Sequence, residues 1–305
     1  MGKSTYQRVH VVINPAAGKD EPTLSVLNDV FRQHEVDWDV SVTHKYGDAT
    51  EQAQAAIADG VDLVAGYGGD GTQHEIANAV LVAQAKAGRT IPMGILPGGT
   101  GNGFAREMGV PGTLREAVTV LCTSANTRSI DVGRLVSVGQ AQVEDRYFIQ
   151  RLYIGVEPEQ QTSRELKDKY GVLAYAASVA KQARASGSRF VADVDGEHLE
   201  FVASKLYVLN SGMMGTGIKI TQTFSIEDGL LDCFAIDVRR IDSVTAAAAR
   251  FLPVPALNHM NYIRQARSVS IDVEPDQPVW TDGEYIGRTP VKIEALPSAL
   301  TVVVP

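Results

Sequence analysis

Apolar and polar positions along the first third of the chain predict strands and helices in turn. Apolar, β-branched runs predict strands at residues 8–13, 38–43, 61–65 and 91–96. Helical spacing of apolar residues, or an alanine-rich composition, predicts helices at 23–34, 48–60, 72–87 and 113–124. This alternation predicts a parallel sheet covered by helices on both faces.

The predicted helix ends carry capping residues. Three helices begin with a polar residue followed three positions later by a glutamate, at Asp48–Glu51, Thr72–Glu75 and Thr113–Glu116. Gly88 stands at the C′ position of the third helix. The apolar face of the first helix is formed by Leu24, Leu27, Val30 and Phe31.

The pattern changes after Thr127. Short runs at 129–133, 146–154, 190–194, 199–202, 206–209, 231–236 and 268–273 predict antiparallel strands, with helices near 158–167, 172–185 and 243–251. We therefore predict an α/β domain at residues 1–131 and a β-rich domain at 132–290. The tail at 300–305 is apolar, so we expect residues 291–305 to return to the first sheet.

Composition narrows the class of protein. The chain has 305 residues, of which 44% are hydrophobic and 21% charged, as in a globular protein of two domains. The net charge of −8 argues against bulk nucleic-acid binding. Cys122 and Cys233 are the only cysteines, which suits a reducing cytoplasm. No apolar run has the length of a membrane span, so membrane contact would need a local surface such as the helix at 172–185.

A glycine-rich turn follows the third predicted strand. Gly66, Gly68, Gly69 and Gly71 surround Asp70 and lead into a helix. Such a turn brings backbone N–H groups and a helix N-terminus to a phosphate, whereas a flexible loop is the alternative reading. An acid there makes sense if a divalent cation lies between carboxylate and phosphate. The turn matches neither a Walker A loop nor the dinucleotide fingerprint.

Two further turns strengthen this prediction. Residues 97–103 form a second glycine-rich turn after the next strand, and residues 14–19 form a polar turn after the first. Ligands bind at the carboxyl ends of strands in parallel sheets. Two phosphate-type loops in one domain are more specific than either alone. Lys19 could reach phosphate or be an ordinary solvated lysine.

The tripeptide Asp-Gly-Glu occurs twice, at 195–197 and 282–284. A hairpin turn explains each copy. Composition alone does not distinguish them.

Several motifs in series resemble those of the diacylglycerol kinase catalytic-domain family, which includes sphingosine kinases and YegS-like lipid kinases. They lie at 14–18, 68–78, 97–106, 130–133, 227–232 and 282–284, and so span nearly the whole chain in order. The resemblance implies an N-terminal domain like those of NAD kinase and phosphofructokinase, a C-terminal β-sandwich, and ATP in the cleft between them.

The resemblance also implies roles for individual residues. The ATP contacts would be Asn14, Pro15, Ala16, Ala17, Gly18, Thr43, Gly68, Gly69, Asp70, Gly71, Thr72, Gln73, His74 and Thr100. Asp70 and Asp131 would lie at a catalytic Mg²⁺, Asp131 through water. Glu284 would be the general base. Ser225, Asp228 and Leu230 would hold a second, structural Mg²⁺.

Two positions depart from the family pattern. Gly103 stands where the family usually has an aspartate, so one acid of the metal network is missing. Glu157 stands in a segment where the family usually has Gly-x-Asp-Ala. Both differences bear on the rate and the acceptor, and neither affects the ATP loop.

Three functions therefore remain. The first is an ATP- and Mg²⁺-dependent lipid kinase of the cytoplasm that phosphorylates a hydroxyl of diacylglycerol or a sphingoid-like lipid at a membrane surface. The second is a kinase of the same fold acting on a soluble alcohol. The third is a nucleotide-binding regulatory relative with weak or no catalysis. The sequence leaves a homodimer open.

Overall fold

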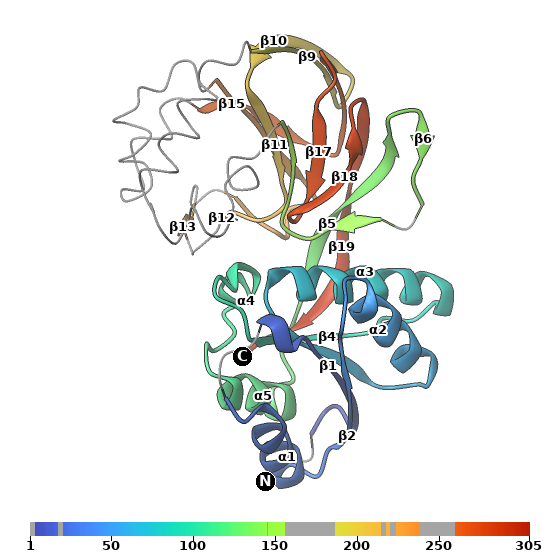
Figure 1. Cartoon of the computed structure of the whole chain (residues 1–305), viewed down its shortest axis with the longest axis vertical. Helices are drawn as coiled ribbons and strands as arrows, with labels where there is room; N and C mark the ends of the chain where they lie inside the picture. Colours follow the sequence, from blue (N-terminus) through green and yellow to red (C-terminus); the bar gives the residue numbers. More distant parts are fainter. Residues whose placement is uncertain are drawn as a thin grey trace.

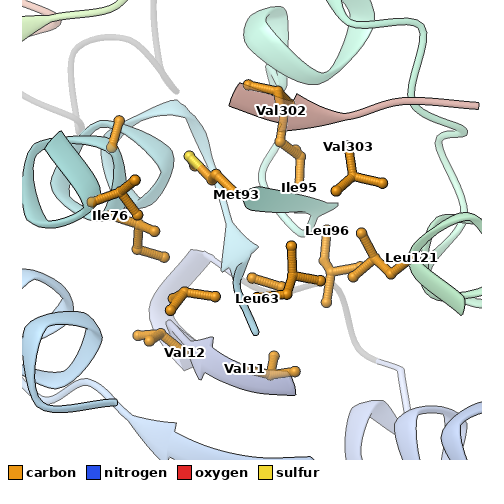
Figure 2. Packing of buried hydrophobic residues seen from close by; sticks show 14 of the residues in the cluster. Val11, Val12, Leu63, Ile76, Met93, Ile95, Leu96, Leu121, Val302 and Val303 are labelled. Atoms are coloured by element: carbon orange, nitrogen blue, oxygen red, sulfur yellow. The ribbon is translucent and has the colours of Figure 1, made fainter. Parts of the chain in front are cut away.

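Four parallel strands form the centre of the first lobe in the computed structural model, which describes residues 4–17, 21–144, 146–155, 187–214, 218–219, 224–237 and 260–305. They lie in the order β2 (Asp37–Val42), β1 (Arg8–Ile13), β3 (Leu63–Gly68) and β4 (Met93–Pro97). The predicted strand ranges match within a few residues. Val11, Leu63, Met93 and Ile95 pack together in the core of this sheet (Figure 2).

Helices cover both faces of the parallel sheet, as predicted. They are α1 (Thr23–Gln33), α2 (Asp48–Ala58), α3 (Asp70–Ala87), α4 (Gly103–Glu107) and α5 (Leu114–Thr123), with a 3₁₀ turn η1 at Pro15–Ala17. Helix α1 packs with α5 and α2 packs with α3, on opposite sides of the strands (Figure 1).

The capping predictions are correct for two helix ends and wrong for two starts. Thr113 caps α5 by accepting a hydrogen bond from the Glu116 amide, and Gly88 ends α3 with a positive φ of 63°. The predicted Thr72–Glu75 box is wrong, because α3 starts at Asp70 and the Glu75 carboxylate accepts from the Gly47 amide (2.9 Å) ahead of α2.

Asp48 and Leu24 also differ from the prediction. Asp48 is the first residue of α2 and its carboxylate accepts from the preceding amides of His44 (2.8 Å) and Lys45 (3.1 Å). It therefore fixes the loop before the helix and does not cap the helix itself. Leu24 is 55% exposed, because the apolar face of α1 that is buried begins one turn later at Leu27.

Two long antiparallel strands, β5 (Thr127–Val138) and β19 (Val291–Val303), run from the first lobe into the second (Figure 1). At its far end β19 joins the parallel sheet, where Val302 lies beside Met93. Their pairing is interrupted by a bulge between Leu296 and Leu300. The predicted domain limit at 131/132 thus falls inside β5.

The second lobe is a β-sandwich, which confirms the predicted fold class. One layer continues through β19 to β16 (Ser268–Glu274), β9 (Ser188–Val194) and β10 (Glu197–Ala203), with the short strands β6 (Ala141–Gln142) and β7 (Tyr147–Phe148) beside β5. The other layer has the order β15 (Met260–Ala266), β14 (Leu231–Ile236), β11 (Lys205–Leu209), β8 (Arg151–Ile154), β17 (Pro278–Thr281) and β18 (Glu284–Arg288). A separate pair is formed by β12 (Met213–Met214) and β13 (Ile218–Lys219).

The helices predicted near 158–167, 172–185 and 243–251 lie outside the described residues, as do Gly18, Lys19 and Glu157. Among the helices that are described, none is both long enough and apolar enough to cross a membrane. Sequence analysis did not predict β15, β17 or β18, although it assigned hairpin turns to both Asp-Gly-Glu tripeptides. It expected residues 291–305 to return to the first sheet, and in the structure this segment contains β19, which pairs with β4 and β5.

Candidate active site

The two glycine-rich turns lie against each other at the carboxyl ends of β3 and β4. The Gly98 amide donates to the Gly68 carbonyl (2.9 Å). A Cβ placed on Gly99 would lie 2.6 Å from the Gly69 Cα, closer than such atoms approach in proteins. Only glycine allows this backbone contact, so the local sequence holds the two turns together as one surface, here called the glycine surface.

Asp70 connects the first turn to the second. Its carboxylate accepts hydrogen bonds from the amides of Gly103 (3.0 Å) and Phe104 (3.0 Å), at the start of α4. Each carboxylate oxygen can accept more than one bond, and the side chain is only partly buried. Asp70 can therefore hold the second turn and still offer oxygen to a cation.

The polar turn after β1 reaches the same edge of the sheet. The Asn14 side chain donates to the Thr72 hydroxyl (3.0 Å) and accepts from the Ala16 amide (3.1 Å). The Thr43 amide donates to the Ile13 carbonyl (2.9 Å) at the end of β2. Pro15, Ala16 and Ala17 form η1. Asn14, Thr43 and Gly68–Thr72 therefore meet at one edge, and Thr100 is exposed on the adjoining turn.

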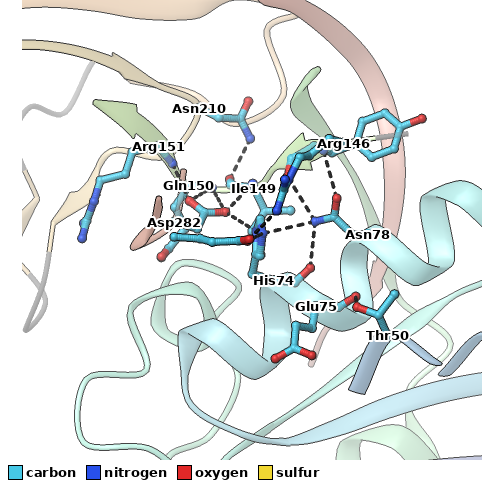
Figure 3. Close-up of polar contacts among 12 residues, drawn as sticks. Thr50, His74, Glu75, Asn78, Arg146, Ile149, Gln150, Arg151, Asn210 and Asp282 are labelled. Carbon is cyan, nitrogen blue, oxygen red and sulfur yellow. Dashed lines mark hydrogen bonds and ion pairs between the residues drawn. The ribbon is translucent and has the colours of Figure 1, made fainter. Parts of the chain in front are cut away.

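Gln73 and His74 use their side chains elsewhere. The Gln73 amide group is buried and donates to the Gly66 carbonyl (2.8 Å) behind the turn. His74 is buried and turned toward the second lobe, where its Nδ1 lies 2.8 Å from Asp282 Oδ2 (Figure 3). Its Nε2 lies 3.7 Å from Glu284 Oε2. The structure does not turn their side chains to the glycine surface.

Asp282 anchors the second-lobe hairpin β17–β18 beside α3. Its buried carboxylate accepts from the amides of Ile149 (2.8 Å), Gln150 (3.1 Å) and Arg151 (2.8 Å) as well as contacting His74 (Figure 3). Burial raises the pKa of this carboxyl, but the His74 hydrogen bond and charge together with the backbone amides outweigh it, so the pKa lies below its usual value.

The first Asp-Gly-Glu copy has the same local structure in a different setting. It forms the β9–β10 hairpin, and Asp195 accepts from the amides of Arg267 (3.1 Å) and Ser268 (2.8 Å). Glu197 pairs with Arg264 (2.6 Å) at the surface. The hairpin reading is therefore correct for both copies, and position in the fold distinguishes them.

Glu284 is held by side chains from three segments. Arg146, just before β7, forms an ion pair with Oε1, His74 faces Oε2, and the Tyr46 hydroxyl forms a further hydrogen bond. Burial raises the pKa of Glu284, whereas the hydrogen bonds of His74 and Tyr46 and the charges of Arg146 and His74 lower it to about 2. The carboxylate is therefore ionised at neutral pH.

His74 is cationic in the same cluster. Burial lowers its pKa, but the hydrogen bonds and negative charges of Asp282 and Glu284 outweigh burial and raise the pKa to about 9. Tyr46, in contrast, has a raised pKa because of burial and the neighbouring Glu284, so its phenol stays neutral.

Sequence reasoning missed Tyr46 and Arg146 as members of this cluster, and it quoted Asp282 only as part of a motif. Their partners are far away along the chain: 208 residues separate His74 from Asp282, and 138 separate Arg146 from Glu284. No local pattern marks such contacts. The one signal in the sequence that pointed to Asp282 was that its tripeptide, Asp-Gly-Glu, repeats the one at Asp195.

Asp131 lies at the junction of the lobes. It is 1% exposed, and its oxygens accept from the amides of Gly229 (2.6 Å) and Ser298 (2.7 Å). In this structure Asp131 joins the turn before β14 to the bulge of β19. No contact of Asp131 with Asp70 is found.

The turn predicted to hold a structural metal is well formed. Asp228 Oδ1 accepts from the Leu230 amide (3.0 Å), and its Oδ2 accepts from the Gln265 side chain (3.2 Å). The Ser225 hydroxyl accepts from the Glu227 amide (3.2 Å). Across the described residues, no three histidine, cysteine or acidic side chains group as a metal site, so any cation would need main-chain, water or substrate oxygens.

Comparisons with known proteins place both lobes of the chain in the same protein family. Residues 8–135 match the family described as "Diacylglycerol kinase catalytic domain", and residues 152–304 match the "YegS C-terminal NAD kinase beta sandwich-like domain". The diacylglycerol kinase of Bacillus subtilis (strain 168) is 27% identical over 307 residues, covering 98% of this chain and 97% of the relative. An uncharacterized protein of Synechocystis, sll0036, is 26% identical and covers 97% and 70%.

Solved structures show the same similarity. A crystal structure of a diacylglycerol kinase from Bacillus anthracis str. Sterne has a TM-score of 0.74 at 25% identity, covering 99% of each chain. Another structure from that organism reaches a TM-score of 0.81 at 26% identity, covering 100% of this chain and 97% of the other.

Proposed function

We propose a lipid kinase activity for this chain, which belongs to the diacylglycerol kinase family. In this proposal the γ-phosphoryl group of ATP is transferred, with Mg²⁺, to a hydroxyl of diacylglycerol or a related sphingoid-like lipid. The protein would act at a membrane surface, which the lipid acceptor requires.

One contact carries the proposal. The 2.8 Å bond between His74 and Asp282 places the hairpin with Glu284 beside the first turns of α3. Asp70 and His74 are four residues apart, so they lie on the same face of α3, about 6 Å apart along its axis. A carboxylate from the second lobe, Glu284, is thereby held beside His74, about one helical turn along α3 from Asp70.

The glycine surface fits the phosphates of ATP. A Cβ on Gly71 would meet no protein atom within 4 Å, and one on Gly101 would meet only Asp70 at 3.5 Å. These glycines are not required by protein packing, which suggests that they leave room for a ligand. Helix α3 begins there, and its first turn has N–H donors without intrahelical acceptors.

The donor set also fits magnesium. Mg²⁺ in kinase sites is usually held by one or two carboxylates together with phosphate oxygens and water. Asp70 offers one such carboxylate next to the proposed phosphate surface, and we propose that Asp131 assists from the lobe junction. Mg²⁺ bound there would neutralise negative charge on the phosphates during transfer.

Glu284 would take the proton of the acceptor hydroxyl. Its low pKa keeps the carboxylate ionised at neutral pH, so that it can orient the acceptor hydroxyl and accept its proton. A positioned base of this kind contributes about 10²–10⁴-fold to rate.

The surroundings of Glu284 favour a lipid over a soluble alcohol. Tyr46, which bonds to Glu284, is 65% exposed, and Tyr285, its neighbour in the chain, is 50% exposed. Exposed tyrosines with one apolar and one polar end are typical of surfaces that meet lipid headgroups. The acceptor hydroxyl would approach between them.

The decisive experiment is mass spectrometry of products after incubating the protein with Mg-ATP and a total lipid extract. We expect a phosphorylated lipid. Glu284→Gln should retain Mg-ATP binding and lose turnover by about 100-fold or more, while Glu197→Gln, the matched change in the other hairpin, should behave like wild type. Phosphorylation of soluble alcohols only would contradict the lipid acceptor, and tight Mg-ATP binding without any product would indicate a regulatory relative.

A further inference from the structure

Glu284 is surrounded by two cations and a tyrosine, with further acids behind them. The groups that face it are Tyr46 from the loop before α2, His74 from α3 and Arg146 from the segment before β7. Behind His74 lies Asp282 of its own hairpin, and Glu75 is the next acid on α3. Two of these groups are cations in direct contact with, or within 4 Å of, the carboxylate.

Cations beside Glu284 would offset the negative charge of the nucleotide in the proposed reaction. A nucleoside triphosphate brings several negative charges close to the base, and nearby negative charge raises the pKa of a carboxyl group. A protonated Glu284 could not accept the hydroxyl proton. The base must therefore be kept ionised by positive charge that the protein supplies.

On the basis of the proposed function, we propose that His74 and Arg146 are positioning residues that keep Glu284 ionised and oriented while the triphosphate is bound. The evidence is geometric: His74 Nε2 lies 3.7 Å from one carboxylate oxygen, and Arg146 pairs with the other. His74 is thereby assigned to the base, and not to the nucleotide.

The orientation of His74 is itself fixed by a chain of bonds. Three backbone amides at 149–151 hold Asp282, and Asp282 holds Nδ1 at 2.8 Å. The opposite ring nitrogen then points to Glu284. The Asn78 side chain, paired with the backbone of Tyr147 through bonds of 2.9 and 3.1 Å, fixes the end of the Arg146 segment (Figure 3).

The raised pKa of His74 supports this role. With a pKa of about 9, the imidazole keeps its charge across the neutral range. Among the described residues, a neutral histidine or a glutamine at this position would leave Arg146 as the only cation on the carboxylate.

The test is the pH dependence of kcat at saturating Mg-ATP, which reports the base in the ternary complex. We expect His74→Gln and Arg146→Gln each to move the acid limb of the profile upward by about one to three pH units. Arg146→Lys, which keeps the charge, should restore most of the limb. The KM for ATP should stay within about twofold in all three, since neither side chain contacts the nucleotide in this proposal.

Two matched variants serve as controls. Arg288→Gln removes another arginine–carboxylate pair from the same strand, β18, where Arg288 Nε lies 2.5 Å from Asp276. His10→Gln removes a partly buried histidine that bonds to Ser41 (2.9 Å) on the first sheet. Both should leave the acid limb in place. A lost hydrogen bond that only loosened the fold would lower the rate without moving the limb.

Acid limbs of His74→Gln and Arg146→Gln that coincide with wild type would overturn the proposal. So would a tenfold rise in KM for ATP in His74→Gln with an unmoved limb, which would place His74 at the nucleotide. If His74→Gln fails to fold, Arg146→Gln decides, because Arg146 is partly exposed.

The proposal can fail separately from the proposed function. If wild type forms no product with any acceptor, the kinase activity is refuted. The ionisation of Glu284 is then followed by ¹³C NMR of labelled carboxyl groups with Mg-ATP bound, using Glu284→Gln for assignment. An unchanged Glu284 titration in His74→Gln and Arg146→Gln would refute the role of the two cations, and an upward shift would support it.

Discussion

Gly71→Ala separates a glycine required by a ligand from one required by protein packing. Gly71 is the second residue of α3 and is exposed, and a Cβ there would meet no protein atom within 4 Å. Its φ is not positive, so alanine can adopt the same backbone. Replacing glycine by alanine at a compatible helix position stabilises a protein by about 0.4–1 kcal/mol. For a chain of this size, we expect Tm to rise by about 0.6–1.6 °C.

Nucleotide affinity should change in the opposite direction. If the triphosphate rests on this turn, the added methyl group occupies ligand space, and a loss of about 1.4 kcal/mol or more corresponds to at least a tenfold weaker Kd. Differential scanning fluorimetry measures Tm, and isothermal titration calorimetry measures the Kd of Mg-ATP. More stable protein with weaker binding is a combination that general damage to the fold cannot produce.

Alanine substitutions at two other glycines serve as controls for this experiment. Gly112→Ala adds a methyl group that also meets nothing within 4 Å, but before α5, so Tm should rise by a similar amount while the Kd of Mg-ATP remains unchanged. Gly99→Ala forces a Cβ to 2.6 Å from Gly69, so it should lower stability by about 1–3 kcal/mol. Unchanged affinity in Gly71→Ala would refute the placement of ATP on this turn.

Three further predictions concern buried charge. Asp282→Ala leaves His74 and three amides without their acceptor and should destabilise the protein by about 3–5 kcal/mol in urea unfolding. The matched Asp195→Ala, at the surface, should lower the free energy of unfolding clearly less. Equal losses in the two variants would contradict the special setting of the second hairpin. The pKa of His74 is raised from 6.5 to about 9, so its stabilising contribution is complete below about pH 6.5 and is lost as pH rises through 9. The free energy of unfolding measured between pH 6 and 10 should show this loss in wild type. A His74→Gln protein whose stability falls with the same slope over this range would refute the prediction. Asp131→Asn should lower Tm in the absence of Mg²⁺, because a side-chain NH₂ replaces one acceptor of the Gly229 and Ser298 amides; an unaffected Tm would mean that Asp131 has no part in holding the lobe junction.

Local sequence predicted much of the first lobe because local physics determines it. The strand at 8–13, the Thr113 cap and the glycine at position 88 depend on neighbours within a few residues. The glycine turns were recognised because close backbone contact leaves a compositional trace, which the Gly69–Gly99 approach explains.

Long-range partners account for what the sequence did not reveal. Glu75 has the spacing of a capping box, yet the Gly47 amide of a neighbouring helix is its partner. Glu284 was assigned by resemblance, but its partners Tyr46 and Arg146 lie on segments that only the folded chain brings near. Two identical tripeptides form the same two-residue turn, and only the position of α3 gives one of them a histidine partner.

The last strand has a consequence for how the protein is made. Because β19 supplies both the partner of β5 and the neighbour of β4, the first lobe lacks one strand of its sheet until residues 291–303 have left the ribosome. Met93 and Ile130 must wait for partners that are synthesised more than 150 residues later. Folding of the N-terminal lobe is therefore completed only after residues 291–303 have been synthesised, and a fragment ending at residue 131 should expose an apolar strand edge to which chaperones or other chains would bind.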